Sequence, residues 1–150
     1  YDYIIIDCMP SLGMITFNAL SASDSVIIPV EAQYLPAKGM EQLLHTVAKV
    51  QKYTNPNLKV EGILLTLVDG RTNFAKMVER EVTEAYGAHI KVYDSKIPVG
   101  TKAAEATATE QSIFEYSPKA KVAEAYMNFA KEVYQDGERE KAKLWTEIDR

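Results

Sequence analysis

The chain opens with an uninterrupted apolar run that ends on a carboxylate. Tyr3, Ile4, Ile5 and Ile6 are all β-branched or aromatic, and Asp7 follows them directly. A run without polar alternation predicts a strand buried on both faces, which is the pattern of a parallel sheet covered by helices. Because ligands of such sheets bind outside the carboxyl ends of the strands, Asp7 is predicted to lie near a nucleotide and its metal. The alternative interpretation is that Asp7 merely caps the following helix, and this segment alone does not separate the two.

Strand and helix patterns alternate along the rest of the chain. Apolar runs and helical periodicity predict strands over 26–30 and 58–68 and helices over 11–22, 40–52, 74–86 and 119–134. Shorter signals predict a turn at 69–72, a left-handed cap at Gly87, an edge strand at 91–94, a helix at 102–109 and a loop at 112–116. The alternation indicates an α/β fold, a doubly wound and mostly parallel sheet with helices on both faces.

Composition restricts the class of protein further. We expect residues 1–135 to form one domain and the charged tail, 136–150, to be helical or disordered. The single Cys8 excludes a disulfide framework, and His45 and His89 are expected to be solvated rather than metal ligands. A net charge of −4 gives no general attraction to nucleic acid. Since no apolar run reaches the ~18 residues that span a bilayer, we expect a cytoplasmic protein without a membrane partner.

Several separated blocks resemble, in the same order, segments of the ParA family of deviant Walker P-loop ATPases, to which Soj and MinD-like proteins are related. The block I-I-I-D-C-M-P-S-L-G, residues 4–13, is similar to the Walker B segment of that family, with Met9 in place of a usual proline. Further similar blocks lie at 18–30, 64–76, 97–106 and 117–126. The resemblance covers most of the chain.

The resemblance implies a partition ATPase that uses ATP and Mg²⁺, forms a homodimer, binds DNA without sequence preference and responds to a ParB-like activator. Asp7 matches the catalytic Walker B aspartate, which supports Mg²⁺ through its water shell. Lys102 matches a basic position that contacts DNA, whereas Val99 stands where the family commonly has arginine. The positions that match nucleotide-binding loops are Pro10, Ser11, Gly13, Thr66, Asp69, Arg71, Pro98 and Glu105. Their alternative interpretation is structural, with Pro98 as a plain loop proline and Asp69 with Arg71 as a surface ion pair.

Neither G-x-x-x-x-G-K-[ST] nor the family's variant K-G-G-x-G-K-T occurs in the sequence. We therefore expect this chain to be the C-terminal part of a ParA-like ATPase, and we expect that part by itself to bind no cofactor and to have no activity. In the family, the strand that carries this loop lies between the Walker B strand and the strand matched by 26–30. We expect this chain to pair those two strands directly, to borrow a strand from another copy, or to be marginally folded.

Two alternatives belong to other classes of function. One is a MinD-like cell-division positioning ATPase, although the tail offers only Leu144, Trp145 and Ile148 to a membrane among many charges. The other is a non-catalytic binding module on the same fold.

Overall fold

The computed structural model describes residues 1–9, 11–33 and 37–148, with side chains for all of these except 37–38 and 139–148. Pro10, one of the predicted site residues, lies outside the described residues. The elements in chain order are α1 (Met14–Ala22), β1 (Ser25–Glu31), α2 (Ala37–Tyr53), β2 (Lys59–Thr66), α3 (Asn73–Tyr86), α4 (Thr101–Ala108), α5 (Ile113–Tyr116) and α6 (Lys121–Ile148).

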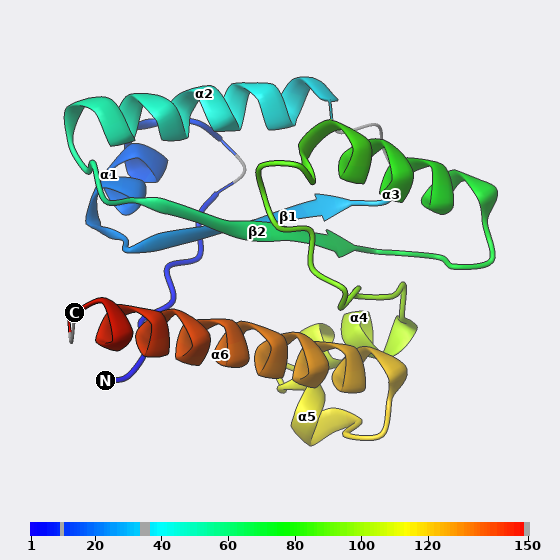
Figure 1. Ribbon diagram of the computed structural model, residues 1–150. Coiled ribbons are helices and arrows are strands. Elements are labelled where there is room, and N and C mark those ends of the chain that lie inside the picture. The colour runs from blue at the N-terminus through cyan, green and yellow to red at the C-terminus, as the bar shows by residue number, and fades with distance from the viewer. Residues whose placement is uncertain (10, 34–36, 149–150) are drawn as a thin grey trace.

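The sheet is parallel, as the sequence predicts. β1 and β2 pair with Ile28 opposite Ile63, and a register irregularity lies between Val26 and Ile27. On the other side of β2, the segment after α3 forms two single parallel bridges, from Val92 to Ile63 of β2 and from Pro98 to Val68 just beyond it. The predicted edge strand at 91–94 is thus reduced to one bridge at Val92. The arrowheads of both strands point to the same end of the molecule (Figure 1).

Helices cover both faces of this sheet. In Figure 1, α2 and α3 lie over one face and α6 runs along the other, with α4 and α5 at its beginning. Ile28 and Ile63 belong to the core beneath α2 and α3, whereas Leu64, Tyr93 and Val122 form a second core beneath α6. The ring of Phe129 meets that of Tyr93 edge-on at a centroid distance of 5.0 Å. The predicted α/β architecture, with strands apolar on both faces, is confirmed.

Two local features, the end of α3 at Gly87 and the segment after Ser112, differ from the sequence predictions. Gly87 ends α3 with a φ of −62° rather than in a left-handed conformation. Glycine is needed there for another reason, because a Cβ would lie 2.5 Å from the carbonyl oxygen of Thr83. The predicted loop at 112–116 contains the one-turn helix α5, which begins where the Ser112 hydroxyl accepts a hydrogen bond from the Phe114 N–H at 3.3 Å.

The predicted opening strand over Tyr3–Asp7 is wrong for this structure. Residues 1–9 have no regular secondary structure, and Ile4 and Ile5 are 80% and 93% exposed. A strand with the pattern of the opening segment needs a neighbouring strand on each side. Among the described residues β1 pairs only with β2, so the opening segment does not lie at the other edge of β1. Of the three expected arrangements, direct pairing of the opening segment with 26–30 is therefore wrong, and the other two stay predictions.

The ends of two helices differ from the sequence predictions. α1 begins at Met14 rather than at residue 11. α6 continues without interruption past residue 135 to Ile148. The division of the chain at 135 stays a prediction.

Candidate functional site

A crevice opens at the carboxyl ends of β1 and β2, the position at which parallel α/β sheets bind ligands. Its volume is about 320 Å³. Three segments that are far apart in the sequence meet there: the end of β1, the turn that leads from β2 into α3, and the turn after Pro98. The lining residues are Ala32, Gln33, Leu67, Asp69, Thr72, Phe74 and Val99.

Leu67 holds a strained backbone conformation at the wall of the crevice. Its φ is +51°, in the left-handed region that a leucine rarely adopts. The residue after it is held through both of its backbone groups by the segment around Pro98, because the Val68 N–H donates to the Ile97 carbonyl at 3.0 Å and the Val68 carbonyl accepts from the Val99 N–H at 3.2 Å. Such strain persists only where neighbours fix the backbone, and it concentrates at functional sites.

A carboxylate and a guanidinium fix the turn that follows β2. Nε and Nη2 of Arg71 donate to Oδ1 and Oδ2 of Asp69, both at 3.0 Å, and the Arg71 backbone N–H also donates to Oδ1 at 3.1 Å. These bonds, the side-chain bond first, lower the pKa of the Asp69 carboxyl and raise the pKa of Arg71. The Arg71 side chain is 91% exposed. Asp69 therefore stays ionised at the crevice while Arg71 reaches into solvent.

Two further predicted residues lie at the same end of the sheet. The Thr66 hydroxyl donates to the carbonyl of Val30 at 3.4 Å and so links the ends of β2 and β1. Pro98 forms the bridge to Val68 that places Val99 at the crevice. Thr66, Asp69, Arg71 and Pro98 thus lie at one end of the sheet, although only Asp69 among them lines the cavity, and their role in nucleotide binding stays a prediction.

Lys102 and Glu105 lie on α4, where they form a cluster with Tyr116. Nζ of Lys102 donates to Oε2 of Glu105 at 2.6 Å, and the Tyr116 hydroxyl donates to the same oxygen at 2.8 Å. The hydrogen bond from Lys102, followed by that from Tyr116, lowers the pKa of the Glu105 carboxyl. Lys102 is half-exposed but already paired, so an anion that binds it must compete with Glu105.

The amino-terminal predicted residues are not brought to the crevice. Asp7 is exposed in the irregular opening segment, Ser11 accepts a hydrogen bond at its carbonyl from the Thr16 hydroxyl at 2.6 Å, and Gly13 caps α1 in an extended conformation. The described residues contain no group of three or more histidines, cysteines and acidic residues suited to a metal. The role of Asp7 in supporting Mg²⁺ through its water shell stays a prediction, because Mg²⁺ keeps several waters and binds through as few as one carboxylate together with substrate phosphates.

Sequence reasoning missed the apolar walls of the crevice, Leu67 and Phe74, and the amide of Gln33. Nothing in the local sequence signals a left-handed leucine. Phe74 follows the helical pattern of α3 but is 41% exposed. The signal that could have identified it is its place, since it is an aromatic residue at the start of a helix that directly follows the turn at the end of a strand.

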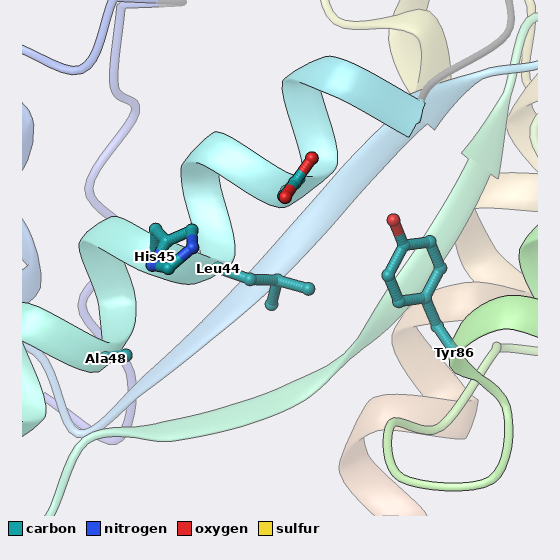
Figure 2. Close-up of a pocket in the computed structure, with 5 residues that line it drawn as sticks. Leu44, His45, Ala48 and Tyr86 are labelled. Atoms are coloured by element: carbon teal, nitrogen blue, oxygen red, sulfur yellow. The ribbon is translucent and has the colours of Figure 1, made fainter.

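A second groove, also about 320 Å³, lies on the outer helical layer between α2 and the end of α3. Glu41, Leu44, His45, Ala48 and Tyr86 line it, and Figure 2 shows the Leu44 side chain directed toward the Tyr86 ring. Both His45 and His89 are exposed, as predicted. The groove lies on the helices rather than at the strand ends, so it lacks the position expected of a nucleotide site.

Comparisons with known proteins agree with the resemblance. Residues 1–60 match a family model described as an AAA domain. The chain is 48% identical to the sporulation initiation inhibitor protein Soj of Bacillus subtilis over 137 residues, which cover 91% of this chain and 53% of Soj. It is 42% identical to the chromosome partitioning protein ParA of Myxococcus xanthus over 133 residues, 89% of this chain and 46% of that protein. The chain spans about half the length of these relatives.

A solved structure shares the fold. The crystal structure of cobyrinic acid a,c-diamide synthase from Mycobacterium smegmatis with bound ADP and magnesium matches with a TM-score of 0.70 and 34% identity, over 88% of this chain and 46% of that one. Within the described ranges, none of the helices combines the length and the apolarity that crossing a bilayer requires. The separated sequence blocks, the parallel sheet and these matches lead to one conclusion: the chain belongs to the ParA/Soj family of P-loop ATPases.

Proposed function

We propose that this chain forms the base-binding side of the nucleotide site in a chromosome- or plasmid-partition ATPase that uses ATP and Mg²⁺ in its full-length form. The observation that carries the proposal is the crevice at the strand ends, with the strained Leu67 in its wall. The names of the curated relatives, Soj and chromosome partitioning ParA, favour partition over cell-division positioning.

The walls of the crevice suit a flat heterocycle. Leu67, Phe74 and Val99 are each 37–50% exposed and offer apolar surface to the faces of a ring. At the rim, the Gln33 amide can donate and accept hydrogen bonds, whereas the ionised Asp69 only accepts. An adenine ring can donate from its amino group to Asp69 and accept from the Gln33 amide at a ring nitrogen. The ADP bound by the similar cobyrinic acid a,c-diamide synthase supports adenine as the base.

The phosphates and the metal require groups that the sequence of this chain does not contain. ATP supplies the phosphoryl group for transfer, and a glycine-rich loop is what holds its phosphates in P-loop enzymes. We propose that Asp7, with Pro10, Ser11 and Gly13, lies beside that loop in the full-length ATPase. Support comes from the exposed run before Asp7, since apolar surface on both faces suits a strand inside a sheet.

DNA binding and dimerisation complete the proposal. Lys102 supplies a phosphate contact that carries no base information, and its pairing with Glu105 and Tyr116 keeps that contact weak until a phosphate displaces the carboxylate. We propose a homodimer, a ParB-like activator, and a cytoplasmic location without a membrane partner.

Titration of the chain with adenosine tests the base site. We expect saturable shifts in a heteronuclear NMR spectrum at Leu67, Phe74 and Val99, with a dissociation constant on the order of 1 mM, since a nucleoside without phosphates forms few contacts. Phe74→Ala should weaken binding several-fold, while Met127→Ala, a matched truncation of an exposed apolar side chain on α6, should leave it unchanged. Guanosine binding as tightly as adenosine, or shifts confined to the groove between α2 and α3, would overturn the proposal.

A further inference from the structure

Two hydrogen-bond donors from different helices meet at one oxygen in the cluster of Lys102, Glu105 and Tyr116. Nζ of Lys102, on α4, and the hydroxyl of Tyr116, on α5, both donate to Oε2 of Glu105, at 2.6 and 2.8 Å. A charged and a neutral donor that converge on one anionic oxygen are the arrangement that also holds an oxygen of a phosphate group. In this structure that oxygen belongs to the protein's own carboxylate.

Neither donor depends on Glu105 for its place. Tyr116 ends α5, where its backbone N–H donates to the Ser112 carbonyl at 2.8 Å, and α5 lies beside α4 at the beginning of α6 (Figure 1). Nζ of Lys102 lies 5.7 Å from the centroid of the Tyr116 ring, within the range of a cation–π contact. The two donors therefore stay together when the carboxylate moves away from them.

Glu105 is an occupant that an external anion can displace. It follows Lys102 by three residues on the same helix, and the two side chains are 41% and 52% exposed. Water solvates a carboxylate that leaves such an exposed pair, so the pair is weak. The hydrogen bond to Glu105, followed by desolvation, raises the pKa of Tyr116 above 10.0, so its hydroxyl is a donor at neutral pH.

We propose that Lys102 and Tyr116 form a two-donor oxyanion site, which the Glu105 carboxylate occupies and blocks until a phosphate oxygen replaces it. The inference rests on the proposed phosphate contact of Lys102 and extends it in two ways. The Tyr116 hydroxyl becomes a second ligand of the phosphate, and Glu105 becomes an inhibitory occupant instead of a nucleotide-binding residue. The ligand is a phosphate group, either free in solution or in a nucleic acid backbone.

Titration of the 150-residue chain with inorganic phosphate, at neutral pH and constant ionic strength, tests the site. We expect saturable shifts of the backbone amide signals of Lys102 and Tyr116. Removal of a negative charge about 5 Å from a bound anion favours binding roughly threefold even in water, so Glu105→Gln should lower the phosphate dissociation constant at least threefold. Glu81→Gln changes an exposed glutamate on α3, over the opposite face of the sheet, and should leave that constant unchanged.

A double-mutant comparison tests the role of Tyr116. In the Glu105→Gln background, where a neutral amide competes weakly for the donors, Tyr116→Phe should raise the phosphate dissociation constant at least twofold. In the wild-type background the same change should have little effect, because the carboxylate and the phosphate lose the same donor. A merely structural role of Tyr116 would produce equal effects in the two backgrounds.

A labelled DNA duplex of about 20 base pairs, followed by fluorescence anisotropy at low salt, separates the two sources of phosphate. We expect Glu105→Gln to tighten duplex binding and Lys102→Ala to weaken it. An unchanged phosphate affinity in Glu105→Gln, shifts confined to other residues, or equal effects of Tyr116→Phe in both backgrounds would overturn the inference. Phosphate binding with the expected dependence but without duplex binding would support the oxyanion site and overturn only the proposed DNA contact.

Discussion

Glu132 on α6 is predicted to be the main ionic attachment of that helix to the sheet. Its carboxylate accepts hydrogen bonds from the backbone N–H groups of Asp94 and Ser95, at 3.1 and 3.0 Å, and Nζ of Lys91 lies 3.0 Å away. Desolvation raises the pKa of the Glu132 carboxyl, but the hydrogen bonds from Ser95, Lys91 and Asp94 outweigh it and lower the pKa to about 2 from 4.5.

The size of the Glu132 pKa shift sets the expected loss in the free energy of unfolding when this carboxylate is removed. At about 1.4 kcal/mol per unit, it corresponds to roughly 3 kcal/mol of stability for a side chain that is 17% exposed, and we expect Glu132→Ala to lose about 2–3 kcal/mol at pH 7. Glu132→Gln keeps a hydrogen-bond acceptor and should lose less. Because the folded-state pKa is depressed, the contribution is complete above the unfolded pKa of about 4.5 and is lost as the pH falls toward 2.

Urea unfolding followed by circular dichroism between pH 7 and pH 2.5 measures the difference between wild type and Glu132→Gln. The difference should shrink steadily below pH 4.5. Glu124→Gln, a change of an exposed glutamate on the same helix, serves as the control and should shift stability by less than about 0.5 kcal/mol. A difference at pH 7 below 0.5 kcal/mol, or one that persists unchanged at pH 2.5, would refute this account.

Three further changes test the fold by the same unfolding assay. Thr72→Ala removes the hydroxyl that accepts from the Ala75 N–H at 3.2 Å at the start of α3, and it should cost about 1 kcal/mol, whereas Thr72→Ser should cost little. Gly62→Ala places a Cβ 2.5 Å from Cε2 of Tyr93, so a loss of about 1–3 kcal/mol is expected, and wild-type stability would disprove the close approach. Tyr93→Phe removes a buried hydroxyl that has no hydrogen-bond partner among the described residues, so it should be neutral or stabilising, and a loss above 1 kcal/mol would reveal a partner.

Two kinds of element could be predicted from sequence, and one could not. β1, β2 and the long helices follow from apolar patterns whose partners lie within the chain. The opening run Tyr3–Ile6 carries the same pattern as β1 and yet forms no strand, because a pattern states what a segment can bury but not whether a neighbouring edge exists. Gly87 illustrates a similar limit, since its role depends on the carbonyl of Thr83 rather than on φ.

The candidate site likewise contains residues that could be predicted from the sequence and residues that could not. Asp69 was identified because it matches a nucleotide-binding loop of the ParA family, and the turn that contains it is placed at the carboxyl end of a strand by topology. The left-handed backbone of Leu67 and the meeting of Gln33 with Val99 depend on bridges between segments that are distant in sequence, and no local signal encodes them. The predicted role of Asp7 depends on a strand over the opening segment, and residues 1–9 do not form a strand in this structure.

The most direct test of the central claim is the ATP affinity of this chain measured beside that of a chimera in which the amino-terminal half of Bacillus subtilis Soj precedes it. If the crevice at the strand ends holds the base and a separate loop holds the phosphates, the chimera should bind ATP at least a hundredfold more tightly than the chain alone, and Phe74→Ala should weaken binding in both. Equal ATP affinity in the two proteins would contradict the account.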